Sequence, residues 1–480
     1  FCNWGHLRRL GLHPLHRRAH RGVQVALSSK ALQYGASAGP QWVTEKLKNI
    51  SLPDISGEMF ILVDTLYYTL TGITIENLEI PEPSVEFYPE STGLKTSVSG
   101  LGVALRGGWM TTYACYRHDG GSFQIAVVDV AVTSVVRLGR EVDGHPLVTS
   151  VSCEAHVGDV HMNFEGGARN SWIFQPFVHQ LAGRLRGEME EKICPSLEDS
   201  IAKFDYHLLA INISIDVNKD LTLDLSLTDE PVVDVSSLNV GLKGAIYSSK
   251  THAEPPFEPQ DFTMAEQPDF MLSLGVSEYT LNSALYAYYS AGLLQVFINE
   301  SMVPSYSPVH LNTSSVGAFI PQLPEMYPDL LMDLQVYARE VPLVSFQPGL
   351  LQLDLQGAVK AFAVQRNGTQ IPLFTLNTDS KFSGKVWISG GRVKGSVELN
   401  NLTLTLEATE IGQFETGKLE KFAGIGARLA MSKLNRLLGE GVDLPRLKQA
   451  ELVNTTLEVE KGFVTILTDA QISLPDGMFN

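Results

Sequence analysis

Alternation of apolar and polar residues is the clearest pattern along the chain. Apolar residues occupy every second position over 211–217, a polar segment typical of a turn follows at 218–220, and alternation resumes over 221–227. A period of two is that of a β-strand, so this stretch predicts a hairpin with one apolar face. Similar alternation over 397–406 predicts further strands, and a change of phase at Asn400 and Asn401 indicates a β-bulge.

Strands that are apolar on one side form antiparallel sheets whose apolar face must be covered. Four segments with apolar residues three and four positions apart predict the helices that cover it. These segments run from Ser28 to about Lys48, from about Asn170 to Ile193, from Tyr279 to Leu294 and from Lys418 to Leu438. For any single helix, such an apolar face is more often ordinary core than a binding surface.

Each half of the chain holds two of these helices and a set of long strands, which predicts an α+β fold. A weak internal echo between residues 46–53 and 433–445, each at the end of a helix, indicates two pseudo-related modules. The proline-rich run Glu254–Pro259 falls between them, so residues 248–268 are predicted to be a linker. The first module is then 23–247 and the second module 269–480. Residues 1–22 contain five arginines and four histidines but no acidic residue and no apolar signal-peptide stretch, so we exclude this doubtful leader from the fold. The alternative is a basic arm that contacts anionic surfaces.

Composition narrows the class of partner. The chain has 480 residues, 44% of them hydrophobic, which is enough for a large core. It has 53 acidic and 36 basic residues and a net charge of −17, so nucleic acid is not expected as a partner. No stretch reaches the roughly 18 apolar residues that a membrane-spanning helix needs.

Motifs of catalysis are missing from the sequence. Neither a Gly-x-Ser-x-Gly nucleophile nor a Gly-x-x-x-x-Gly-Lys phosphate loop occurs. The best metal candidate combines Cys153, His156, His161 and Glu165, but on a regular strand its two histidines face opposite sides unless a bulge at 158–159 realigns them. We therefore expect no enzyme, no cofactor and no metal site.

Glycosylation sequons point to the secretory route. Seven Asn-x-Ser/Thr sequences without an intervening proline predict a secreted, extracellular or granule glycoprotein. They begin at Asn49, Asn212, Asn299, Asn312, Asn367, Asn401 and Asn454.

Several segments, taken in order, resemble the bactericidal permeability-increasing protein and lipopolysaccharide-binding protein family. The segments that carry the resemblance are 23–32 and 46–54 at the opening, 254–257 in the linker, and 274–279 and 291–294 at the start of the second module. Residues 151–153 and 192–195 resemble the segments of the single family disulfide, which implies a bond between Cys153 and Cys194.

The resemblance implies a boomerang of two barrels, each a long twisted sheet wrapped around helices, joined by a central sheet and the linker. Each barrel would hold the acyl chains of a phospholipid in an apolar pocket between helix and sheet. The first pocket would be lined by Leu32, Val43, Leu47, Phe174, Phe177, Val178, Leu181 and Leu185. The second would be lined by Leu281, Leu285, Tyr286, Phe422, Ile425 and Leu429.

The charge of the first module departs from the basic tip of bactericidal members. Residues 23–247 hold 15 basic and 28 acidic residues. This leaves Arg106 and Arg117 as candidate contacts for lipid phosphates. Four apolar residues near the predicted tip are an alternative means of contact with a membrane or lipoprotein surface. They are Met59, Phe60, Trp109 and Met110.

The sequence therefore predicts a secreted protein of innate defence against Gram-negative bacteria that binds phospholipid or lipopolysaccharide. An alternative is the transfer of phospholipid or neutral lipid between lipoproteins or membranes, which the acidic first module favours. A third reading is a glycosylated scaffold without an exchangeable ligand, whose cores would be closed.

Overall fold

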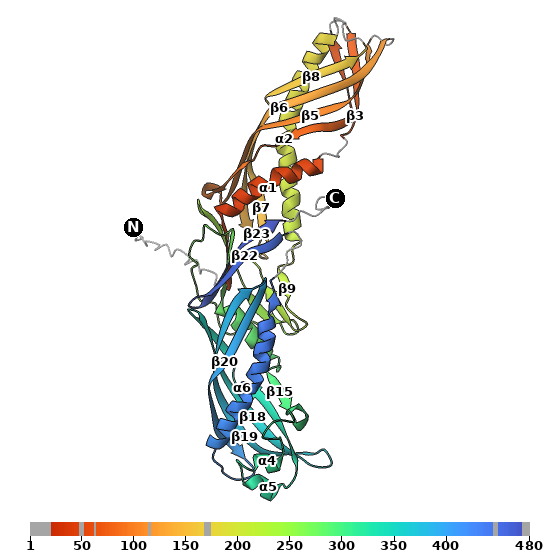
Figure 1. The fold of residues 1–480 in the computed structure, drawn as a ribbon. Helices are drawn as coiled ribbons and strands as arrows, with labels where there is room; N and C mark the ends of the chain where they lie inside the picture. Colours follow the sequence, from red (N-terminus) through yellow and green to blue (C-terminus); the bar gives the residue numbers. More distant parts are fainter. Residues whose placement is uncertain are drawn as a thin grey trace, which may run out of the picture.

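The computed structural model describes residues 21–47, 52–61, 64–113, 117–167, 174–444 and 450–472. The molecule is elongated, with a curved sheet and a long helix towards each end and a further sheet between them (Figure 1). Residues 1–20, most of the predicted leader, lie outside the described residues. Among the described helices, none has both the length and the apolarity needed to cross a membrane.

A six-stranded antiparallel sheet joins the two halves of the chain. Strand β1 (Val23–Ser28) pairs with β12 (Ser237–Leu242) on one side and with β14 (Leu272–Ser277) on the other. The sheet continues through β11 (Val232–Val233) beyond β12, and through β23 (Phe463–Ile472) and β22 (Ala450–Val459) beyond β14. The first described strand thus lies directly beside the first strand after the predicted linker.

Residues 249–271 connect β13 (Ala245–Ser248) to β14 without forming a helix or a strand. This segment packs on the central sheet. Phe262 stacks on Phe463 with ring centroids 4.6 Å apart, and Gln24 Nε2 donates to the Phe262 carbonyl at 2.7 Å. A Cβ at Gly275 would meet the Phe262 ring at 2.5 Å, so the close approach of the segment requires glycine there.

The first module is a seven-stranded sheet that curves beside helix α2 (Phe174–Leu209) (Figure 1). In spatial order its strands are β2 (Ile55–Ile61), β3 (Asp64–Glu79), β5 (Gly93–Tyr113), β6 (Arg117–Arg140) and β7 (Pro146–His156). Strand β4 (Ser84–Tyr88) also pairs with β5, and β8 (Asp159–Gly166) also pairs with β6. Helix α1 (Ser29–Leu47) packs against β4, and the short helix η1 (Pro89–Ser91) links β4 to β5.

The second module has a comparable seven-stranded sheet beside helix α6 (Gly417–Glu440). In spatial order its strands are β15 (Gln295–Ile298), β16 (Leu331–Ala338), β18 (Leu350–Val364), β19 (Gln370–Ser389), β20 (Arg392–Thr409) and β21 (Val442–Asp443), with β17 (Leu343–Gln347) also on β18. Within the described residues, the other helices are α3 (Glu278–Ser290), α4 (Thr313–Val316), α5 (Gln322–Met326) and η2 (Glu300–Met302). A small sheet of β13, β10 (Leu221–Asp224) and β9 (Ser214–Asp216) lies near the middle of the molecule (Figure 1).

The two modules repeat one order of elements. Each begins with a strand of the central sheet, β1 or β14, followed directly by a helix, α1 or α3. A curved antiparallel sheet and a long helix follow, and the chain then returns to the central sheet through β12 or through β22 and β23. The predicted α+β fold with two related modules is confirmed.

Several helices and strands begin or end at residues other than those predicted from the sequence. Helix α2 continues past Pro195 to Leu209, where the sequence pattern predicts an end at Ile193. Proline has no backbone N–H and so cannot donate the helical hydrogen bond at its position. Because Pro195 is exposed, this missing hydrogen bond lies on the solvent side of the helix. The hairpin after Leu209 forms only two short strands, and Ile215 and Val217 are about half exposed, at 47% and 52%.

The predicted bulge near Asn401 is confirmed. The pairing of β19 with β20 shifts between Lys381, opposite Asn401, and Phe382, opposite Leu399. Helix α3 ends at Ser290, before the predicted Leu294, because the chain turns at Gly292, whose φ is +68°.

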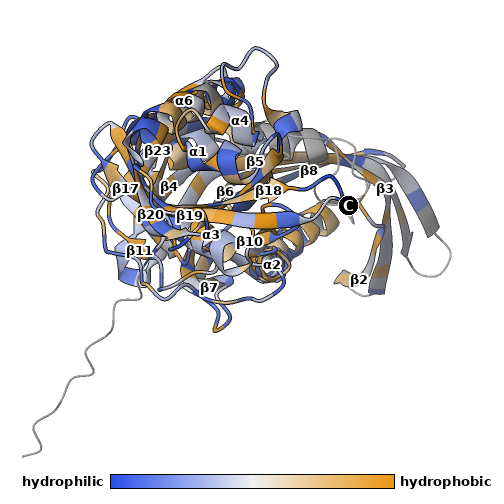
Figure 2. Ribbon diagram, turned by 90° about the horizontal axis from the view of Figure 1, so that it is seen from below, coloured by the Kyte–Doolittle hydropathy of each residue, from blue (hydrophilic) through white to orange (hydrophobic). Residues whose placement is uncertain are grey.

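The core is divided between the modules. In the first module the apolar cluster lies between the sheet and α2, where Phe164 contacts Trp109 and Phe177 at centroid distances of 5.7 and 5.8 Å. In the second module a separate cluster is centred on the fully buried Ile320, Leu323 and Leu373. Figure 2 shows hydrophobic and hydrophilic positions interleaved along the strands, as expected for sheets with one covered face.

Candidate functional site

The long helices α2 and α6 lie along the open edges of their sheets. On α2, Glu190 Oε2 accepts from the Val157 N–H at 3.0 Å, and Asp205 Oδ1 accepts from the Val148 N–H, on the edge strand β7, at 2.7 Å. Unpaired backbone groups at a sheet edge need such partners. Polar side chains of the helix therefore hold it against the edge, while its apolar side chains face the sheet interior.

Helix α6 uses the same arrangement on β20. Glu420 Oε2 accepts from the Leu404 N–H at 3.0 Å, and Asn435 bonds both backbone groups of Val397. The opposite edge of this sheet is β15. Val296 and Phe297 point to opposite faces of β15 and are 50% and 57% exposed, so this edge strand is accessible on both faces.

Apolar side chains of α6 are accessible as well. Phe422 is half-buried and stacks on Phe319, with centroids 5.1 Å apart. Ile425 and Leu437, in contrast, are 53% and 54% exposed. The register places Val296 opposite Val336, on the face of the sheet that carries the buried Met332. The accessible apolar residues of α6 and of the opposite edge strand β15 are candidate binding positions, which we together call the second seam: Val296, Ile425, Leu434 and Leu437.

In the first module, the apolar face of α2 changes from sealed to partly open along the helix. Phe177 is 2% exposed and Leu181 is fully buried. Val178, Leu185, Met189 and Ile193 are half-buried and pack at the margin of the same cluster. We call these four residues the first seam, because at these positions the apolar face of α2 is partly exposed to solvent.

The disulfide lies at the end of the first seam. Cys194 follows Ile193 and is bonded to Cys153 on β7, with Cα atoms 5.6 Å apart. The pairing implied by the sequence resemblance is confirmed. Since Cys153 is in a disulfide, it cannot serve as a thiolate metal ligand.

Other predicted pocket residues lie apart from the seams. Leu32 packs with Phe87 and Leu238 near the central sheet, in a cluster different from that of Leu181. Leu281, Leu285 and Tyr286 lie on α3, which packs on β13 and β17, and the Tyr286 ring contacts Phe257 edge-on. The side chains of Val43, Leu47, Phe174 and Leu429 lie outside what the structure describes.

At the tip of the first module, strand alternation separates the four apolar candidates. Met59 and Trp109 are core residues, 9% and 5% exposed, whereas Phe60 and Met110 are 66% and 58% exposed. Tyr67, which sequence reasoning did not single out, is 52% exposed and lies diagonally between Phe60 and Met110 on the outer face. Alternate residues of a strand point to opposite faces, so only one of each consecutive pair can reach a surface.

The two candidate phosphate contacts, Arg106 and Arg117, lie on the neighbouring strands β5 and β6. Arg106 is exposed, on the same face of β5 as Met110. Arg117 begins β6, but its side chain lies outside the described residues.

The predicted glycosylation sites are mostly accessible. Five of the asparagines are exposed: Asn212, Asn299, Asn367, Asn401 and Asn454. Asn312 is half-buried, and its Oδ1 accepts from the Ser315 N–H at 2.7 Å as the N-cap of α4. Asn49 lies outside the described residues.

Comparison with known proteins gives matches over nearly the whole chain. The model of the LBP / BPI / CETP family N-terminal domain matches residues 31–204, and that of the C-terminal domain matches residues 215–472. The chain is 34% identical to the bactericidal permeability-increasing protein of Sebastes schlegelii over 474 residues, which cover 98% of this chain and 99% of the relative.

More distant relatives are similar in extent. The lipopolysaccharide-binding protein of Homo sapiens is 25% identical over 456 residues, covering 94% of each chain. A crystal structure of lipopolysaccharide binding protein, 23% identical, superposes with a TM-score of 0.59 over 95% of this chain and 100% of that chain. At this level of identity, the superposition shows that the two proteins share a fold.

Proposed function

The chain belongs to the LBP / BPI / CETP family, and from this premise we propose that it is a lipid-binding protein that holds acyl chains in the first and second seams. The observation that carries the proposal is the second seam, where Ile425, Leu437 and Val296 are each at least half exposed. Bound acyl chains would cover these apolar side chains. Each buried methylene contributes roughly 0.8 kcal/mol, so part of two acyl chains suffices for strong retention.

The names of the relatives favour bacterial lipid as the ligand class. The similar proteins include a bactericidal permeability-increasing protein and lipopolysaccharide-binding proteins, so we propose phospholipid or lipopolysaccharide as ligand and innate defence against Gram-negative bacteria as the role. Apolar burial would dominate the affinity, since the first module has 28 acidic and only 15 basic residues over 23–247. No chemical step is needed for this function.

Transfer of phospholipid or neutral lipid between lipoproteins or membranes is the second candidate. The excess of acidic residues in the first module favours it, because a protein that shuttles lipid need not be attracted to lipid A phosphates. In either case contact with a membrane or lipoprotein surface would be peripheral, with Phe60, Tyr67 and Met110 as apolar contacts and Arg106 and Arg117 as phosphate contacts.

Secretion is part of the proposal. The Cys153–Cys194 disulfide suits an oxidising compartment, and five exposed sequon asparagines suit glycosylation along the same route. On this basis we place the protein outside the cell or in a secretory granule.

Organic extraction of the purified, secreted protein followed by mass spectrometry tests the function. We expect phospholipid in stoichiometric amount, and a protein free of lipid that takes up none from vesicles would refute the proposal. Incubation with donor and acceptor vesicles then separates the two roles. Movement of labelled phospholipid between vesicles indicates transfer, whereas uptake without delivery indicates binding alone.

A further inference from the structure

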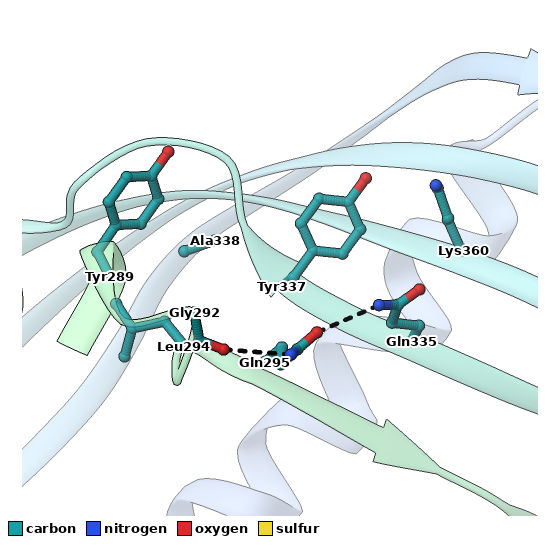
Figure 3. A pocket seen from close by; sticks show the side chains of 8 residues that line it. All are labelled: Tyr289, Gly292, Leu294, Gln295, Gln335, Tyr337, Ala338 and Lys360. Atoms are coloured by element: carbon teal, nitrogen blue, oxygen red, sulfur yellow. Dashed lines mark hydrogen bonds between the residues drawn. The ribbon is translucent and has the colours of Figure 1, made fainter.

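A cavity of about 430 Å³ lies where the chain leaves α3 and meets β15, β16 and β18 (Figure 3). Its volume falls within the range of roughly 300–1,000 Å³ typical of small-molecule sites. The lining residues with side chains able to recognise a ligand are Tyr289, Gln295, Gln335, Tyr337 and Lys360.

The polar wall of this cavity lies on the face of the sheet that points away from the core. Gln335 is paired with Lys360 across β16 and β18, and Tyr337 follows Gln335 by two residues, so the three side chains share one face. Met332 and Leu334, which point to the other face, belong to the apolar core cluster. A ligand in this cavity would therefore be separate from the second seam.

The wall combines two aromatic rings with one ammonium group. Figure 3 shows the hydroxyls of Tyr289 and Tyr337 pointing the same way, with Lys360 beside Tyr337. Lys360 Nζ is 5.9 Å from the centroid of the Tyr337 ring. Within the described part of the chain it has no carboxylate partner, although the protein carries a net charge of −17. An unpaired cation in an acidic protein is a ready partner for an anionic group.

Two amides complete the polar lining. Gln335 Nε2 donates to Gln295 Oε1 at 3.2 Å, and Gln295 Nε2 donates to the Gly292 carbonyl at 3.1 Å. These bonds fix the orientation of both amides. Each amide has two donor hydrogens and an acceptor oxygen, so both keep capacity for hydrogen bonds to hydroxyl groups.

From these groups we infer that the cavity binds a sugar that carries a phosphate or a carboxylate. The tyrosine rings can cover the apolar face of a sugar ring, the amides can bond its hydroxyls, and Lys360 can pair with its anionic group. A cationic ligand is disfavoured because Lys360 already lies over the Tyr337 ring. A fully apolar ligand would cover the remaining donors and acceptors of the two amides without bonding them.

Binding of an anionic sugar is distinct from the acyl-chain function and can first be measured without lipid. The full-length protein is titrated by calorimetry with glucose 6-phosphate, glucuronic acid, glucose and inorganic phosphate. We expect saturable binding of the two anionic sugars, with glucose and phosphate each at least about tenfold weaker, since one charge-assisted hydrogen bond corresponds to about that factor.

Variants locate the site. Lys360→Gln should weaken glucose 6-phosphate about tenfold, Tyr337→Ala should weaken both anionic sugars, and Tyr337→Phe, which keeps the ring, should retain most of the affinity. Lys381→Gln is the matched control: Lys381 is exposed on β19, opposite Asp354 and away from the cavity. Absence of saturable sugar binding, or equal binding by Lys360→Gln and the unchanged protein, would overturn the inference.

The anionic sugar can be free or part of a glycolipid headgroup. Vesicles of phosphatidylcholine with and without lipopolysaccharide are added to the protein loaded with glucose 6-phosphate. Displacement by the lipopolysaccharide vesicles alone assigns the site to a headgroup, and retention of the sugar assigns it to a free ligand. Lipid content measured by mass spectrometry is independent of both outcomes, so failure of the sugar site leaves the acyl-chain function standing.

Discussion

Asn435 on α6 pairs with Val397 on β20 as a neighbouring strand would. The Val397 N–H donates to Asn435 Oδ1 at 2.7 Å, and Asn435 Nδ2 donates to the Val397 carbonyl at 2.8 Å. Glu420 bonds the same strand farther along, and Glu190 and Asp205 of α2 make the corresponding contacts in the first module. In the sequence, Glu190 and Asp205 are separated by the same number of residues as Glu420 and Asn435. The repeat of the modules therefore extends to how each helix is attached to its sheet.

Removal of this attachment should loosen α6. Asn435→Ala leaves the N–H and the carbonyl of Val397 without partners, so we expect a loss of about 1–3 kcal/mol in the free energy of unfolding. Urea denaturation followed by circular dichroism measures it. Ser432→Ala, an exposed position on the same helix, is the control and should change stability by less than about 0.5 kcal/mol. Equal effects of the two substitutions would contradict the attachment.

The sequence predicts the four long helices and the alternating strands because hydrophobic periodicity reports directly on burial. It does not predict the attachment of α6, since Glu420 and Asn435 have the appearance of ordinary solvent-facing residues on an amphipathic helix. The end of α2 is missed because Pro195 normally stops a helix, and here its position at the solvent side allows the helix to continue. Accessible Val296 lies on a four-residue strand, which is too short to show a periodic signal.

Loss of the disulfide should destabilise the first module. Cys153 and Cys194 are separated by 41 residues, and closing a loop of that length corresponds to about 4 kcal/mol in the chain-entropy model. The variant with both cysteines replaced by alanine should therefore lower the midpoint of urea unfolding. Peptide mapping without reduction provides the complementary measurement, in which both residues should appear in one linked peptide. Recovery of two free thiols from secreted protein would contradict the bond.

Acid should weaken the contact between α1 and the central sheet. Lys30 Nζ lies 2.9 Å from both carboxylate oxygens of Asp469 on β23, and the Met271 N–H donates to the same carboxylate. Burial by itself would raise the pKa of Asp469, but hydrogen bonds from Lys30, Asn454 and Met271 outweigh burial and hold the pKa below its ordinary 3.8.

A carboxyl whose pKa is lowered by folding stabilises the protein above its unfolded pKa, and that stability is lost as the pH falls through its folded pKa. We therefore expect part of the stability to disappear below about pH 4, and Asp469→Asn to reduce this part of the pH dependence. Urea midpoints measured in steps from pH 6 to the acid limit check it. An Asp469→Asn profile parallel to that of the unchanged protein would show that other carboxyls are responsible.

Binding of lipopolysaccharide should depend only weakly on salt. The first module has an excess of acidic residues, so little electrostatic attraction to lipid phosphates is available for screening. Between low salt and about 0.5 M sodium chloride we expect affinity to change by less than about threefold. A steep loss of affinity in the same titration would reveal a basic surface that the charge count of the module conceals.

Substitutions in the second seam should separate lipid binding from folding. Ile425 and Leu437 are 53% and 54% exposed, so replacing both with serine removes little packing and should cost at most about 1 kcal/mol of stability. Lipid retained per folded molecule should fall, because the acyl chains lose apolar contacts and meet two hydroxyl groups. Leu181 is the opposite case: it is fully buried, so Leu181→Ala should cost about 2–5 kcal/mol by opening a cavity.

The measurement is bound phospholipid per folded protein, with folding checked by urea denaturation. Val235→Ser serves as the control, since Val235 is 83% exposed, lies outside both seams and should alter neither quantity. If the double serine variant keeps the full lipid content while folded, the second seam is not where the acyl chains lie. If Leu181→Ala lowers lipid content in the molecules that remain folded, the sealed part of the first-module cluster also belongs to the binding site.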